Sequence, residues 1–219
     1  MKKILYLYLI VLLYSCSSTQ LKKDAYKGLY EEKPVSVLIM PPINRSTDVD
    51  AKEYFHSTLL TPLANAGYYV IPPFLSMEIL KKESAYDAEL FMDAPLNKFG
   101  KIFGADLVLF TVINKWDKSK LAGKIYVELE YIFKSTKTNE VCYSRTAKIN
   151  YNTSISGSGS LLADMVLTAI STAATKYVAV ARESNKFTLK DLPVGKYHPK
   201  YQNDGDETAG AKIFKKNLP

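Results

Sequence analysis

Cysteine and histidine are scarce in this sequence, which limits the chemistry that the chain can perform. Its 219 residues include two cysteines and two histidines. His56 and His198 cannot form a zinc site alone, and no cluster of cysteine and histidine accompanies them. A catalytic thiol would need a nearby base. With no convincing catalytic set and no metal or cofactor motif, we expect a protein that is not an enzyme.

The apolar run at the start of the chain is too short to cross a membrane. It covers residues 4–14, after two lysines, whereas a span needs roughly 20 residues. Two lysines, a short apolar core and small residues are the layout of a bacterial secretory signal. Residues 13–16, Leu-Tyr-Ser-Cys, resemble the lipobox of bacterial lipoproteins, in which the cysteine is lipidated on sulfur. We predict a signal peptide over residues 1–15 and a lipid on Cys16; an ordinary cleaved signal and an anchor helix are the alternatives.

The charge of the chain, formally +7, would ordinarily suggest nucleic acid as a partner. An exported protein rarely meets nucleic acid, and the positive charges are spread along the chain, so simple solubility is the favoured interpretation. Phosphates of the cell envelope, or its cell-wall polymer, are the alternative anions. Ser17 rather than aspartate follows Cys16, which argues against retention in the inner membrane. We expect a lipid-anchored outer-membrane protein that faces the periplasm. With Cys16 lipidated, Cys142 has no disulfide partner, and a half-buried structural thiol is favoured.

Hydrophobic patterning predicts an α/β domain. Apolar or alternating runs bounded by proline, glycine and polar turns indicate strands, and apolar residues at helical spacing indicate helices. We expect one mixed β-sheet of about five strands packed against helices, with parallel first strands and a final antiparallel meander. The strands are expected at 35–40, 68–71, 107–113, 125–133 and 141–152, and the helices at 50–66, 75–82, 87–91, 96–103 and 161–181.

Composition divides the chain around this domain. Residues 16–33 are polar and without pattern, which favours a tether, and the α/β domain then covers 34–182. Residues 183–219 are rich in lysine, aspartate, proline and glycine, and are expected to form an extended C-terminal arm. Within it, residues 204–207 lack the twelve-residue calcium pattern and are expected to be solvated. On the sheet, Glu128 is expected to form a cross-strand ion pair with Lys148.

Two stretches of the chain resemble a known lipoprotein family. One begins Pro-Pro-Ile-Asn-Arg-Ser-Thr-Asp at residues 41–48 and continues over 61–72, and the other covers 103–116. They resemble the bacterial lipoproteins of the genome-derived Neisseria antigen type, which are distantly similar to the curli-secretion lipoprotein CsgG and the N-terminal domain of TolB. The resemblance implies an outer-membrane lipoprotein, accessory to secretion or envelope assembly, with no catalytic residues to transfer.

The first matching stretch supplies the candidate contact residues. Asn44, Arg45 and Asp48 lie in a predicted loop with no obvious task in the core, and Trp116 ends the second stretch. Our first hypothesis is a lipoprotein that binds other envelope proteins through these residues. The second is a binding module for a small envelope ligand or glycan, which requires a deep pocket lined by aromatics. An enzyme, third, would need titratable groups that converge in a cleft.

The lipid can be tested directly on the cysteine that carries it. We expect Cys16→Ala to lose metabolic labelling with fatty acid, because the acyl chains depend on that sulfur. Labelling that persists in the variant would end the lipoprotein interpretation.

Overall fold

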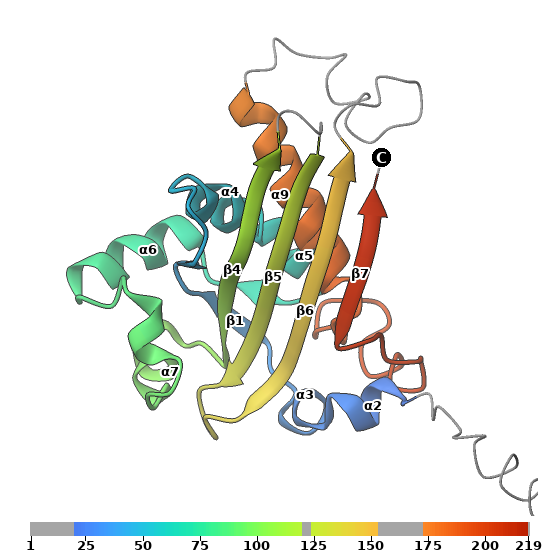
Figure 1. Cartoon of the computed structure of the whole chain (residues 1–219). Helices are drawn as coiled ribbons and strands as arrows, with labels where there is room; N and C mark the ends of the chain where they lie inside the picture. The colour runs from blue at the N-terminus through green and yellow to red at the C-terminus, as the bar shows by residue number, and fades with distance from the viewer. Residues whose placement is uncertain (1–19, 120–123, 153–172, 219) are drawn as a thin grey trace, which may run out of the picture.

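A computed structural model describes residues 20–119, 124–152 and 173–218 (Figure 1). The predicted signal peptide, Cys16 and the first part of the last predicted helix lie outside these residues. The described part forms one mixed sheet with helices packed on it, so the predicted fold class is confirmed.

The sheet has seven strands rather than about five. They are β1 (Ser36–Ile39), β2 (Ile43–Asn44), β3 (Tyr69–Val70), β4 (Leu107–Ser119), β5 (Lys124–Ser135), β6 (Val141–Asn152) and β7 (Ile213–Leu218). Their order is β3-β1-β4-β5-β6-β7, with β2 paired to β4 off this path. β1 is parallel to both β3 and β4, and β4, β5 and β6 form the predicted antiparallel meander. The two unpredicted strands are β2, in the expected loop, and β7, which is parallel to β6 in the expected arm.

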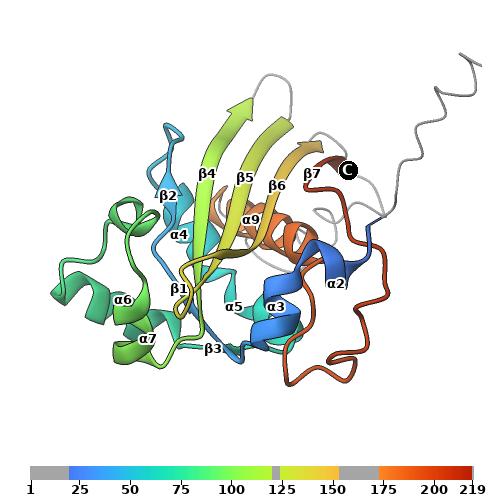
Figure 2. The same cartoon turned by 90° about the horizontal axis from the view of Figure 1, so that it is seen from below.

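Helices lie on both sides of the sheet (Figures 1 and 2). They are α2 (Lys22–Ala25), α3 (Lys27–Glu32), α4 (Ala51–Ser57), α5 (Leu60–Asn65), α6 (Pro73–Lys82), the 3₁₀ helix η1 (Ala88–Phe91), α7 (Asn97–Phe103) and α9 (Ala173–Leu189). In β1, Val37 and Ile39 enter one apolar core with α4, α5 and α9, whereas Leu38 enters a second core with α6, η1 and α7. Met40, just after the strand, belongs to the second core as well. Because both faces are covered, β1 is apolar at nearly every position.

Hydrogen bonds from buried tyrosines connect α9 to the sheet. The hydroxyls of Tyr151 and Ser184 are 3.0 Å apart, and Tyr131 donates to the side chain of Asn185. Tyr143 donates to a backbone carbonyl of the same helix at 3.4 Å. A buried hydroxyl without a partner would be costly, so these contacts let three of the sixteen tyrosines lie in the core.

The single helix expected over residues 50–66 is interrupted, and α4 and α5 take its place. Pro62 cannot donate a backbone hydrogen bond, and a new helix that begins at residue 60 places it in the first turn, where no donor is needed. Asn185 covers the break, because its amide donates to the carbonyl of Phe55 at 3.0 Å and to the hydroxyl of Thr58 at 2.8 Å. Gly67 follows α5 with φ of 86°, as expected for a left-handed helix end.

The boundaries predicted for the ends of the chain are wrong. The expected tether contains the helices α2 and α3, and Tyr26 between them and Leu29 in α3 enter the core. The expected arm begins inside α9 and ends in β7. A backbone bridge between Leu21 and Thr208 joins the two ends. Each end folds because it packs on the other, which composition alone does not reveal.

Two predictions about charged residues have opposite outcomes. Glu128 and Lys148 are cross-strand neighbours, and their charged atoms are 2.9 Å apart, as expected. Asp204, expected to be solvated, is 1% exposed and accepts a hydrogen bond from the hydroxyl of Tyr30 at 3.0 Å. It also pairs with Lys22 at 3.6 Å. The acidic segment is therefore part of the fold.

Asp106 fixes the start of β1. Its Oδ2 accepts the backbone N–H groups of Val35 and Ser36 at 2.9 and 3.1 Å, and the hydroxyl of Ser36 lies at 3.1 Å. Burial alone would raise the pKa of this carboxyl, but these donors, helped by Lys137, hold it below the ordinary value of 3.8. Such hydrogen bonds favour the ionised form.

We expect Asp106→Ala to lower the free energy of unfolding by about 2 kcal/mol, since it removes a charged acceptor from two backbone donors. Because the pKa is depressed on folding, this stabilisation is present above pH ~4 and is lost as the pH falls below it. Asp106→Asn keeps an oxygen acceptor, so it should lower the free energy of unfolding by less than Asp106→Ala does. Because an amide does not titrate, this variant should also lose less stability below pH ~4. Urea unfolding at several pH values measures both effects, and an unchanged acid dependence in Asp106→Asn would contradict them.

Candidate interaction site

The predicted contact loop is held together by its own side chains. The amide of Asn44 donates to the carbonyl of Asp48 at 2.7 Å, and its Oδ1 accepts the N–H of Ser46 at 3.0 Å. The carboxylate of Asp48 forms an ion pair with Lys118. Asn44 and Asp48 therefore determine the conformation of the loop. Arg45 is the exposed member, with a half-exposed side chain that reaches Glu89 of η1 at 3.7 Å.

Trp116 is a core residue, so the prediction that it contacts a partner is wrong. It is 3% exposed and packs edge-on against Phe55, with ring centroids 5.2 Å apart. The pairing of β4 with β5 shifts between Ile113 and Lys115. After this bulge Trp116 faces the same core as Ile113, although uninterrupted alternation would put it on the opposite face. The sequence does not reveal this bulge.

The helical layer of α6, η1 and α7 carries an exposed apolar surface that the sequence analysis missed. In α6, Phe74 and Leu75 are 77% and 59% exposed, while Ser76 is buried. The Ser76 hydroxyl is satisfied by the carbonyl of Pro73 at 3.2 Å, so this helix buries a polar residue and exposes apolar ones. Isolated exposed apolar residues are common, whereas large contiguous patches of them are typical of interaction sites. We call this group the α6 surface; it consists of Phe74, Leu75, Ile79, Leu90 and Ile102.

The predicted loop borders the α6 surface. Arg45 forms its ion pair with Glu89, the residue before the exposed Leu90. Val49, farther along the same loop, is 83% exposed. A charged residue at the edge of an apolar area is the usual arrangement of a protein interface, which has an apolar centre and a polar rim. The structure thus brings Arg45 to this surface.

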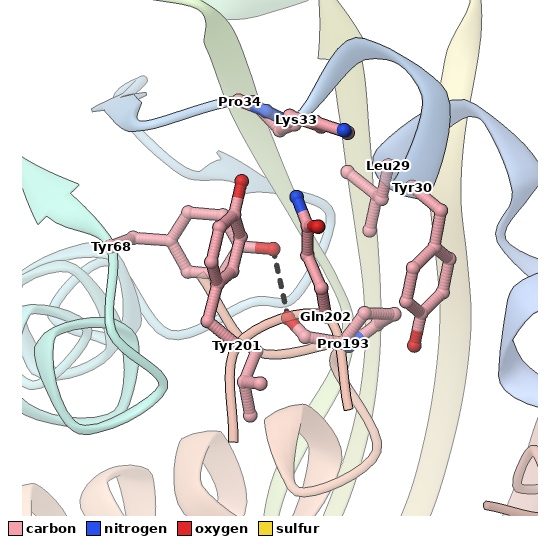
Figure 3. Close-up of a pocket in the computed structure, with 9 residues that line it drawn as sticks. Leu29, Tyr30, Lys33, Pro34, Tyr68, Pro193, Tyr201 and Gln202 are labelled. Carbon is pink, nitrogen blue, oxygen red and sulfur yellow. Dashed lines mark hydrogen bonds between the residues drawn. The ribbon is translucent and has the colours of Figure 1, made fainter. Parts of the chain in front are cut away.

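The pocket in Figure 3 lies between α3 and the segment that follows α9. The hydroxyl of Tyr68 donates to the carbonyl of Pro193 at 2.8 Å, and Tyr201 and Gln202 lie beside it. Burial raises the pKa of Tyr68, so its hydroxyl stays protonated. The cavity has a volume of only about 10 Å³, far below the roughly 300–1,000 Å³ of small-molecule sites. It gives little support to the small-ligand hypothesis.

A second pocket, of about 270 Å³, opens beside Gln20 and is lined by Tyr26, Cys142 and Lys212, among others. Burial, with a smaller effect of nearby Glu32, raises the pKa of the Cys142 thiol to about 11. A thiol that stays protonated at neutral pH is a poor nucleophile. Cys142 is thus a buried structural residue, as expected.

The described part of the chain has neither a metal cluster nor a membrane-spanning helix. There, no three side chains of histidine, cysteine, aspartate or glutamate are placed to hold a metal ion. His56 is buried, and burial lowers its pKa in spite of Glu53. In the same residues, no helix has both the length and the apolar character needed to cross a bilayer.

Comparison with known proteins identifies related chains. The family model described as "Putative lipoprotein GNA1162-like" matches residues 24–192. A putative lipoprotein of Neisseria meningitidis serogroup B (strain ATCC BAA-335 / MC58) is 28% identical over 154 residues, which cover 69% of this chain and 72% of the relative. The crystal structure of lipoprotein GNA1162 from Neisseria meningitidis aligns with a TM-score of 0.52 and 27% identity, covering 63% of this chain and 95% of that one.

A more distant structure is the PelC dodecamer of Paraburkholderia phytofirmans. It aligns with a TM-score of 0.42 and 16% identity, over 74% of this chain and 90% of that chain. A likeness this low supports no statement about function.

If the α6 surface is not part of the core, polar substitutions there should leave stability unchanged. We expect Phe74→Glu to change the free energy of unfolding by less than about 0.5 kcal/mol. Leu80→Ala, on the buried side of the same helix, should cost about 3 kcal/mol. Urea denaturation of both variants measures the difference, and equal losses would show that Phe74 has a structural role.

Proposed function

The chain belongs to the GNA1162-like lipoprotein family, and from this we propose that it is an outer-membrane lipoprotein that faces the periplasm and binds another envelope protein. In this proposal Cys16 carries the lipid, and the α/β domain acts through contacts rather than catalysis. A role accessory to secretion or envelope assembly fits the resemblance to the curli-secretion lipoprotein.

The exposed apolar side chains of the α6 surface are the observation that carries this proposal. Exposure of Phe74, Leu75 and Leu90 to water is unfavourable. Burying them against a partner stabilises the complex by roughly 25 cal/mol for each Å² of apolar surface covered. Aromatic and aliphatic residues of this kind form the centres of protein interfaces. Arg45, held beside η1 by Glu89, supplies the charged edge.

A protein fits this surface better than the lipid bilayer does. The chain leads toward Cys16 from the start of α2, beside the segment that runs into β7. Both views place α2 at the β7 side of the sheet and α6 and α7 at the β1 side (Figures 1 and 2). An anchor beside α2 therefore directs α6 and α7 away from the membrane that holds it.

Site-specific photo-crosslinking in living cells tests the partner contact. A photoreactive amino acid at position 74 should give one discrete adduct, at least about fivefold stronger than at position 148. Lys148 serves as the control because it is exposed on the sheet, far from α6 in the fold.

The α6 surface should also control this adduct. We expect Leu75→Glu and Arg45→Glu each to weaken it at least about threefold while the protein level stays the same. An adduct of equal strength at positions 74 and 148, or one insensitive to both substitutions, would contradict the proposed interface.

A further inference from the structure

The chain is held by the fold from Gln20 onward. The carbonyl of Gln20 accepts the N–H of Ala209 at 2.8 Å, and the N–H of Lys22 donates to the carbonyl of Glu207 at 2.9 Å. An antiparallel bridge joins Leu21 to Thr208 between these two bonds. The first described residues thus run alongside the C-terminal segment in a fixed register.

Side chains strengthen this attachment. The ammonium group of Lys22 lies 3.6 Å from Asp204 and 3.0 Å from Glu207, and the Lys22 and Asp204 side chains are 8% and 1% exposed. Lys23 pairs with Asp206 at 2.7 Å. Removing one partner of a buried ion pair strongly destabilises a protein, because the other charge is left unpaired in the interior. The start of α2 therefore does not separate easily from residues 204–209.

The length of chain left for a spacer is very short. Only residues 17–19 stand between Cys16 and Gln20. The four residue-to-residue steps from Cys16 to Gln20 span at most about 14 Å, even when the chain is fully extended. A lipid attached to Cys16 ends at the base of the headgroup layer, which is about 6 Å thick in one leaflet. Gln20 is then held within about 8 Å of the membrane surface.

From this geometry we infer that the end of the domain around Gln20 lies directly against the bilayer that holds the anchor. This exit face consists of the exposed residues Gln20, Lys23, Asp206, Thr208 and Lys212. The inference rests on the proposed lipidation of Cys16. The bilayer is the occupant of this face, because the spacer leaves no room for a partner between the two.

The short covalent connection between Cys16 and Gln20, rather than charge, holds the exit face at the membrane. Lys23 is paired with Asp206, so the face carries both signs of charge, and its orientation does not depend on anionic lipid. The α6 surface lies across the sheet from this face (Figures 1 and 2). It therefore projects away from the membrane, at a distance set by the width of the domain.

Fluorescence quenching in vesicles tests this orientation. Full-length lipidated protein with Thr208→Cys or Phe74→Cys, each in a Cys142→Ala background, is labelled with a fluorophore, since the introduced cysteine is then the free thiol. Vesicles of phosphatidylethanolamine and phosphatidylglycerol carry a spin label on the lipid headgroup. We expect quenching at position 208 to be at least about threefold stronger than at position 74, and unchanged when phosphatidylglycerol is left out.

A spacer insertion is the matched control. About fifteen glycine and serine residues inserted between Ser18 and Thr19 lengthen the flexible reach to about 20 Å or more, and should weaken quenching at position 208 at least about twofold. Flotation with the vesicles tests the lipoprotein proposal separately from the inferred orientation. A chain that does not float overturns the lipoprotein proposal together with the inference, whereas a chain that floats with equal quenching at both positions overturns the inference alone.

Discussion

The buried contact between Lys22 and Asp204 joins the two ends of the chain and determines how the molecule can be oriented. It acts together with the core packing of Tyr26 and Leu29 and with the backbone hydrogen bonds that hold the start of α2 to residues 205–209. With these contacts, both ends become part of one face of the domain. The distance between a lipid on Cys16 and the fold then depends on residues 17–19 alone, instead of the whole segment 17–33.

The sheet separates this face from the surface that we assign to a partner. Helices α4, α5 and α9 pack on one side of it, with hydrogen bonds from Tyr131 and Tyr151 fixing α9. The smaller layer of α6, η1 and α7 packs on the other side of β1 and β4. That layer fills its own core with residues such as Leu80 and Phe99 and leaves Phe74 in water. A rigid sheet lies between the two surfaces.

Much of the fold could be predicted from the sequence, because the central strands are long and their patterns are strong. The meander, its ion pair between Glu128 and Lys148, and the glycine after α5 all follow from local rules. The short helices α2 and α3 could not be predicted, since segments of four and six residues are stable only through tertiary contacts. β7 was missed because its residues, Ile-Phe-Lys-Lys-Asn-Leu, neither alternate nor form an apolar run. In the site, Arg45 could be predicted because it lies in the family motif. The inward position of Trp116 could not, because it depends on a bulge. The exposure of Phe74 could not either, because it depends on which side of α6 meets the sheet.

The pairing of Lys22 with Asp204 also bears on how the protein is made. These residues are separated by most of the chain, and synthesis proceeds from the N-terminus. Lys22 therefore has no Asp204 to pair with until that part of the chain has emerged, and β7, the last strand, must still reach β6. The newly made chain cannot complete its fold while the segment that holds Asp204 and β7 is still on the ribosome. Such a dependence on distant contacts slows folding, so the chain stays open for longer before it closes.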